Sequence, residues 1–225
     1  MNSLAIDTST SQCVLGVSKG QLRYTRVIDS GRSHSRDILP NIESLMAEAQ
    51  LALQELDVII FGQGPGSFTG LRIAVGVVQG LGYGLGIPVV PLSTLACLAY
   101  GEFVRSGAEN VLVALTARQE EVFYGAYSMI DDEYPTFVIS ESVCDVRALP
   151  SLTGDWSLIG SGSNLQTKIE RATGIGFIDV QPDCQVSPDA LLSLGEFRWR
   201  DGSSVSAMDA RPEYLRQTVA VKPSR

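Results

Sequence analysis

Histidine is nearly missing from this chain, since His34 is the only one among its 225 residues. A metal site that needs two imidazoles, such as the H-E-x-x-H arrangement of zinc peptidases, is therefore excluded. A Ser-His-Asp triad would have His34 as its only base. We expect no catalytic residue and no metal ligand here, and we interpret His34 as a surface or interface residue.

Positive charge is also scarce. The chain has 17 Lys and Arg residues against 25 Asp and Glu residues, which gives a formal net charge of −8 and an isoelectric point near 4.7. A phosphate backbone attracts a protein mainly through Lys and Arg, which release its counterions. Unaided binding to a nucleic acid is therefore disfavoured, although a basic partner would reverse this.

The chain also lacks a C-x-x-C pair and a long uninterrupted apolar run. The longest apolar region, residues 71–100, contains Arg72, Pro88 and Pro91, so we expect no membrane span. Its first apolar stretch contains Asp7 and has no basic segment before it, unlike a secretory signal. The widely spaced cysteines indicate buried thiols and a reduced, cytoplasmic protein. They are Cys13, Cys97, Cys144 and Cys184.

With 44% hydrophobic residues, the chain can bury a core as one large domain or two small lobes. In the first half, β-branched runs alternate with segments of helical periodicity, which predicts a β-β-β-α-β-α-β-α order with parallel strands. The expected strands cover residues 3–7, 13–18, 22–28, 56–61 and 88–91. The expected helices cover residues 35–49, 71–83 and 95–104.

The second half repeats the opening pattern of strand, polar loop and strand at residues 111–115 and 122–130, which indicates a shortened copy of the first half. Further strands are expected at 137–140, 156–159 and 177–180, and helices at 163–173 and 188–200. We therefore predict an N-terminal lobe at 1–106 and a reduced C-terminal lobe at 107–225. The polar tail after Asp201 is expected either to fray or to return to the first lobe.

The most distinctive stretch is GPGSFTGLR at residues 64–72, between a buried strand and a helix. Such junctions expose backbone N–H groups and suit anions. The spacing matches neither common phosphate motif, since Leu71 replaces the P-loop lysine and Thr69 replaces the third glycine of G-x-G-x-x-G. Phosphate binding and a capped tight turn both remain open. The candidate phosphate-binding residues are Gly64, Gly66, Ser67, Thr69 and Gly70.

Asp7, Thr8 and Ser9 follow the first strand, where actin-like and sugar-kinase-like ATPases hold phosphate and metal-bound water. We name all three as candidate nucleotide or phosphate contacts. The loop has no glycine for close backbone approach, and the matching loop at 116–118 has no carboxylate to complete a Mg²⁺ site. Autonomous phosphoryl transfer is therefore not expected. A third loop, GSGSN at 160–164, would either back an adenine ring or form a capped turn.

Gly76, Gly80 and Gly84 recur every four residues in the second expected helix. Each glycine costs about 1 kcal/mol relative to alanine in a helix interior, so the row needs an offsetting close contact. That contact could come from the sheet, from the first helix or from a partner subunit.

Four segments together closely resemble the TsaB family, also called YeaZ: LAIDTS at 4–9, HSRDILP at 34–40, residues 64–72, and PEYLR at 212–216. The resemblance implies a two-lobed α/β fold of the actin-like, ribonuclease-H-like type found in sugar-kinase-like ATPases. It also implies membership of the machinery that makes threonylcarbamoyladenosine next to the anticodon of tRNAs. One departure is TARQ at 116–119, where the family commonly has Asp-Ala-Arg-Met.

In that family the protein is a non-catalytic partner of the metal-dependent transferase TsaD, joined by the ATPase TsaE and supplied by TsaC. The resemblance therefore implies a scaffold that pairs through its first two helices. A homodimer of the isolated chain through the same helices is a subsidiary prediction, since an apolar bundle face left unpaired tends to self-associate. The resemblance also implies contact with tRNA only through the complex, no membrane contact and no intrinsic cofactor, with any ATP or ADP bound in the assembled complex. The implied partner-binding residues are His34, Arg36, Ile38, Leu39, Ile42, Leu45, Ala49, Arg72, Gly76, Gly80 and Gly84. The alternative function is an autonomous actin-like ATPase or kinase that uses Asp7; a peptidase is a third hypothesis.

Overall fold

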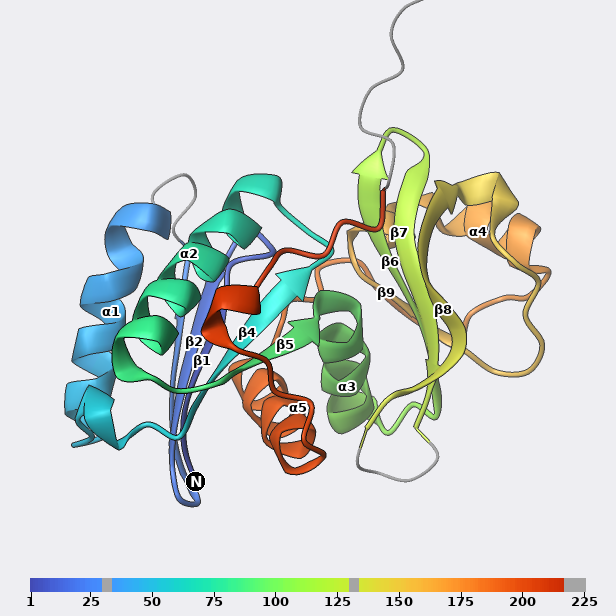
Figure 1. Cartoon of the computed structure of the whole chain (residues 1–225). Helices are drawn as coiled ribbons and strands as arrows, with labels where there is room; N and C mark the ends of the chain where they lie inside the picture. The colour runs from blue at the N-terminus through green and yellow to red at the C-terminus, as the bar shows by residue number, and fades with distance from the viewer. Residues whose placement is uncertain (30–33, 130–133, 217–225) are drawn as a thin grey trace, which may run out of the picture.

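The computed structural model describes residues 1–29, 34–129 and 134–216, which form two five-stranded sheets side by side (Figure 1). The first sheet has the order β3-β2-β1-β4-β5. Its strands are β1 (Asn2–Asp7), β2 (Cys13–Lys19), β3 (Leu22–Ile28), β4 (Val58–Gly64) and β5 (Val89–Ser93). The first three strands are antiparallel, and β4 and β5 run parallel to β1. This confirms the expected hairpins followed by helical crossovers.

The second sheet has the order β10-β9-β6-β7-β8, which repeats the order of the first when read from the other edge. Its strands are β6 (Asn110–Arg118), β7 (Glu121–Ser128), β8 (Thr136–Asp145), β9 (Ser157–Ile159) and β10 (Asp179–Gln181). The pairing senses also repeat, with an antiparallel meander and two parallel strands. The repeated strand order confirms the predicted two-lobed actin-like fold class. The predicted shortening of the second copy is also confirmed, since β9 and β10 have only three residues each.

Four helices cover the two faces of the first sheet, and alternate residues of the central strands point to each face. α1 (His34–Glu48) and α2 (Phe68–Leu85) pack with Leu4 and Ile6 on one face. α3 (Thr94–Ser106) and α5 (Pro188–Arg200) pack with Ala5 and Ile60 on the other. Figure 1 shows α1 and α2 beside each other on the outer side of the molecule. No helix in the described ranges is long and apolar enough to cross a membrane.

The chain returns to the first sheet after its second sheet is complete. α5 lies so close to β4 that a Cβ added at Gly195 would be 2.4 Å from Ile60 Cδ1. Beyond α5, Val205 pairs with Val89 of β5, and a 3₁₀ turn, η4 (Ala207–Asp209), packs on α2. The region assigned to the second lobe from its sequence thus includes segments that pack on the first. The tail does not fray as far as residue 216, and residues 217–225 lie outside the described ranges.

Two elements of the second half, β8 and the helix expected at 163–173, have other boundaries than expected. β8 extends through polar residues beyond 140 because it is a half-exposed edge strand. The expected helix at 163–173 is a 3₁₀ turn, η3 (Ser161–Leu165), followed by α4 (Gln166–Thr173). Two of the four predicted buried thiols, Cys144 and Cys184, are only half-buried, whereas Cys13 and Cys97 are fully buried.

Candidate functional site

The loop after β1 is closed by its own side chains. The backbone N–H and the hydroxyl of Ser9 both donate to Asp7 Oδ1, at 2.8 and 2.7 Å. Asp7 Oδ2 is buried without a hydrogen-bond partner in the described structure, and burial raises the pKa of this carboxyl to about 6. Asp7 is 0% exposed, so the carboxylate does not reach the space between the lobes.

The glycines needed for close approach to this loop come from elsewhere in the chain. A Cβ added at Gly62 would lie 1.7 Å from Asp7 Oδ2. One at Gly66 would lie 2.2 Å from the Ser9 carbonyl oxygen, and one at Gly70 would lie 1.8 Å from that of Thr8. The sequence interpretation sought a glycine inside the loop, whereas the fold supplies three from β4 and the segment that follows it.

The glycine-rich segment at 64–72 therefore forms a capped turn that packs on the first loop. Ser67 caps α2 by accepting a hydrogen bond from Gly70 N at 3.2 Å. Ser67 N donates to the Ser9 carbonyl at 2.7 Å, and the Thr8 hydroxyl donates to the Gly70 carbonyl at 2.7 Å. Two N–H groups expected to face a phosphate, those of Ser67 and Gly70, are thus engaged within the chain. Gly64, with a φ of 112°, faces Leu71, and Thr69 is exposed at the start of α2.

The loops predicted to face each other do meet at one inter-lobe cleft of about 440 Å³. Ser9 and Ser67 line it from the first lobe, and Thr116 and Ser161 line it from the second. The Ser161 hydroxyl accepts a hydrogen bond from Thr116 N at 3.0 Å. Among the described residues, no group of three or more His, Cys, Asp or Glu side chains could hold a metal ion. The cleft thus has hydroxyl groups from both lobes.

The predicted partner-binding residues separate into buried and exposed sets. The apolar stripe of α1 packs into the first core, so its members cannot contact a partner in this fold, and the prediction for them is corrected. They are Ile38, Ile42, Leu45 and Ala49, with exposures of 0–3%. Leu39 is 52% exposed, and Arg36 and Arg72 are exposed. His34 was also predicted to bind the partner. α1 begins at this residue, but its side chain lies outside the part of the chain that the structure describes.

The three spaced glycines of α2 have nothing within 4 Å of an added Cβ. Both intramolecular contacts considered from the sequence, with the sheet and with α1, are therefore wrong. Gly82, on the other side of α2, provides a contrast, because its added Cβ would lie 2.7 Å from Ala207 Cβ. The row formed by Gly76, Gly80 and Gly84, together with Tyr83, which is 71% exposed, is an open surface.

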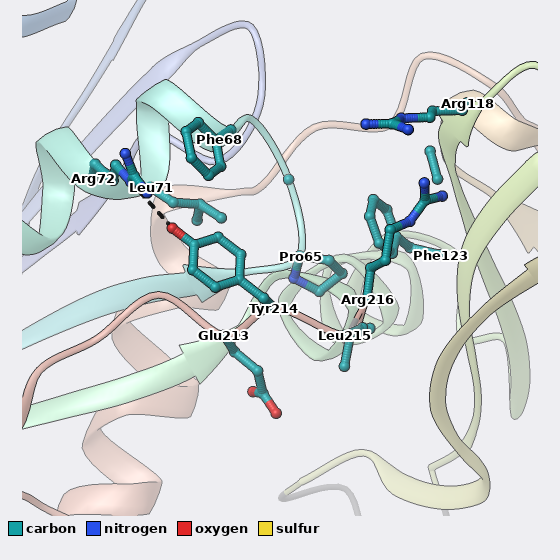
Figure 2. A pocket seen from close by; sticks show the side chains of 12 residues that line it. Pro65, Phe68, Leu71, Arg72, Arg118, Phe123, Glu213, Tyr214, Leu215 and Arg216 are labelled. Carbon is teal, nitrogen blue, oxygen red and sulfur yellow. Dashed lines mark hydrogen bonds between the residues drawn. The ribbon is translucent and has the colours of Figure 1, made fainter. Parts of the chain in front are cut away.

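A second cavity, of about 660 Å³, was not expected from the sequence (Figure 2). The returning tail forms part of its wall, and Glu213 N donates to the Gln63 carbonyl at 2.8 Å. The segment PEYLR at 212–216 forms part of this cavity. In the sequence analysis it supported the family resemblance, but no structural role was predicted for it. Return of the tail to the first lobe is one of the two expectations stated for it, but the sequence pattern could not show that it passes β4 and lines a cavity.

Comparisons with known proteins agree with this architecture. A family model described as TsaD, tRNA N6-adenosine threonylcarbamoyltransferase, matches residues 28–182. The tRNA threonylcarbamoyladenosine biosynthesis protein TsaB of Haemophilus influenzae is 31% identical, over 97% of this chain and 95% of its own length. The TsaB protein of Escherichia coli is 30% identical, over 99% and 97%.

A solved structure shows the same similarity in three dimensions. YeaZ from Pseudomonas aeruginosa superimposes with a TM-score of 0.87 and 34% identity, covering 95% of this chain and 99% of its own. Both sequence relatives and this structure match along nearly their full lengths, so the similarity includes both lobes and the returning tail. The chain therefore belongs to the family of that threonylcarbamoyltransferase model and, within it, to TsaB, also called YeaZ.

Proposed function

We propose that this chain acts in tRNA threonylcarbamoyladenosine biosynthesis as a non-catalytic subunit that binds and activates TsaD. The names of its full-length relatives and the matching transferase family support the pathway. TsaE would join the assembled complex and TsaC would supply the activated threonylcarbamoyl group. tRNA, and any ATP or ADP, would engage the complex in the cytoplasm.

The observation that carries this proposal is the open glycine row on α2. Glycines in a helix interior cost about 1 kcal/mol each relative to alanine, and no residue of the described chain approaches these three. A helix from a second polypeptide could approach the bare backbone closely and offset this cost. Phe68 and Arg72 precede the row at the same spacing of four residues and are also exposed, but they line the cavity between the lobes. The partner would therefore contact the outward side of α2 at the glycine row.

The first loop supports a division of labour in which the chemistry takes place on TsaD. Asp7 is buried and capped by Ser9, and Thr116 occupies the second-lobe position where a matching acid would be needed. A kinase mechanism would require the first loop to open and a second carboxylate to be supplied. The geometry thus favours the scaffold over the alternative ATPase.

We also propose a homodimer for the isolated chain, since Leu39 and Tyr83 are exposed on α1 and α2, and exposed apolar side chains without a partner tend to self-associate. Sedimentation over a range of concentrations would measure this. A monomer at all concentrations would contradict the homodimer, while leaving the pairing with TsaD to be measured separately.

The function is tested by reconstituting the transfer reaction with TsaC, TsaD, TsaE and unmodified tRNA. We expect threonylcarbamoyl transfer to require this chain, and Gly80→Glu to abolish both TsaD binding and transfer. Gly176→Glu is the matched control, because Gly176 is also exposed and nothing lies within 4 Å of its added Cβ. Full transfer without the chain, or with Gly80→Glu, would reject the proposal. ATP turnover by the chain alone that is lost in Asp7→Asn would establish the kinase instead.

A further inference from the structure

The cavity of about 660 Å³ lies between the N-terminal end of α2 in the first lobe and the tip of the β6–β7 hairpin in the second. The segment at 213–216 passes along it, so residues from three distant parts of the sequence share one pocket. Figure 2 shows Phe68 and Tyr214 on one side and Phe123, Arg118 and Arg216 on the other. The pocket thus combines aromatic rings with guanidinium groups.

The first-lobe wall is held in place by contacts among its own side chains. The rings of Phe68 and Tyr214 are 5.8 Å apart at an angle of 33°. The guanidinium carbon of Arg72 lies 3.8 Å from the centre of the Phe68 ring, and Arg72 Nε donates to the Tyr214 hydroxyl at 3.2 Å. Phe68 is 56% exposed and Tyr214 is 45% exposed, so this ordered aromatic surface faces solvent. A planar ligand could stack there without reorganising the wall.

The opposite wall carries positive charge that the described chain does not neutralise. Arg118 is exposed, and its guanidinium has no hydrogen-bond or ion-pair partner among the described residues. Arg216 is paired with Glu121. Glu213 is the acidic residue that lines the pocket, but its carboxylate accepts a hydrogen bond from Gln63 at 2.7 Å and points away from the arginines (Figure 2). An anionic group in the pocket would therefore meet Arg118 directly.

We infer that this pocket binds an unpaired nucleotide of an RNA, with its base against the aromatic rings and its phosphate at Arg118. Aromatic and guanidinium planes are the surfaces on which single-stranded RNA bases stack. This inference rests on the proposed function, because a chain of net charge −8 needs a partner complex to hold RNA. The pocket would be the part of this subunit that contacts the tRNA.

A free nucleotide shares this chemistry, but the pocket favours a strand. Ser67 N of the nearby glycine-rich segment donates to the Ser9 carbonyl at 2.7 Å, so this N–H group is not free for a polyphosphate. A single phosphodiester carries one negative charge, which Arg118 alone could neutralise, whereas a polyphosphate carries several. AMP and ATP therefore serve as the competing ligands in the test.

The test uses the complex of this chain with TsaD and an anticodon stem-loop RNA that carries 4-thiouridine in its loop. We expect photo-crosslinks to peptides containing Phe123 or Tyr214, and their loss in Phe123→Leu and Arg118→Ala. In the transfer assay both variants should raise KM for tRNA about tenfold with kcat within about twofold, since stacking and phosphate contacts act on binding. Arg118→Ala should also reduce the slope of log K against log salt by about 0.7.

Arg171→Ala is the matched control, because it removes another exposed arginine of the second lobe that lies outside the pocket. It should keep the wild-type KM and crosslinks, and all variants should bind TsaD normally. Unchanged KM and crosslinks in the Arg118 and Phe123 variants would overturn the inference. So would AMP or ATP binding that depends on Arg118 without any RNA crosslink. If transfer does not require the chain at all, the proposed function fails; if transfer requires it but these variants behave as wild type, only this inference fails.

Discussion

At the scale of single residues, Asp7 shows how a motif shared with phosphate-binding proteins can serve another purpose. Its carboxyl is buried, one oxygen is capped by Ser9 and the other faces Gly62. Sequence reasoning identified the two segments that meet here, residues 7–9 and 64–70. It could not show that they fill each other's space, because the pairing of distant loops depends on the register of β1 with β4.

The raised pKa of Asp7 predicts a pH dependence of stability. Burial raises this pKa from 3.8 to about 6, so the folded state holds its proton more strongly than the unfolded state does. Below about pH 4 this group therefore contributes about 3 kcal/mol to the free energy of unfolding. The contribution is lost as pH rises through about 6. Asp7→Asn should gain stability relative to wild type over this window. Urea unfolding at several pH values measures it, and a constant difference between the two proteins would contradict the expectation.

At the scale of elements, the sequence predicted nearly every helix and strand but misassigned one surface. The periodicity of α1 shows that one side is apolar without showing what covers it. The structure places Ile38, Ile42 and Leu45 against the sheet of the same chain. Glycine spacing was more informative for α2, since an open row has no packing role inside the chain. An Ala49→Glu variant would consequently disrupt the core rather than test partner binding, because Ala49 is 1% exposed.

The glycine row allows stability and partner binding to be changed in opposite directions. Replacing Gly76 and Gly80 by alanine should stabilise the monomer by about 2 kcal/mol, since alanine favours an exposed helix and meets no neighbour. The same added methyl groups should weaken TsaD binding by holding a partner helix away. Thermal unfolding at low concentration and titration with TsaD measure the two effects.

Gly82→Ala is the control for this pair of measurements. Its added Cβ would lie 2.7 Å from Ala207 Cβ, so it should destabilise the fold by about 1–3 kcal/mol. Alanines at 76 and 80 that leave TsaD affinity unchanged would remove the reason for assigning this row to an interface.

At the scale of the whole molecule, α3 and its contacts hold the two lobes together. Glu102 on α3 is 1% exposed and accepts two hydrogen bonds from Arg105, at 2.9 and 2.7 Å. Arg105 also donates to Asp179 of β10 at 2.5 Å. At another point between the lobes, Glu141 of β8 accepts hydrogen bonds from Ser93 and Tyr127. No sequence pattern linked these residues, which are separated by up to 74 positions in the chain.

Arg105→Ala should therefore destabilise the molecule. The substitution leaves the Glu102 carboxylate buried with only the Ser106 hydroxyl as a side-chain partner, which costs about 1–3 kcal/mol since Arg105 itself is half exposed. Arg147→Ala is the matched control, since Arg147 also pairs with a carboxylate, Asp145, but its side chain is 74% exposed. It should cost less than about 1 kcal/mol. Equal losses in chemical denaturation would show that Arg105 has no special role between the lobes.

The central claim is that the open side of α2 faces TsaD, and site-specific photo-crosslinking tests it most directly. A benzophenone amino acid would replace Tyr83, which is 71% exposed beside the glycine row, or Val104, which is 66% exposed on α3. After irradiation of the chain mixed with TsaD, the account predicts a covalent adduct from position 83 and none from position 104. Capture of TsaD at position 104 but not at position 83 would contradict it.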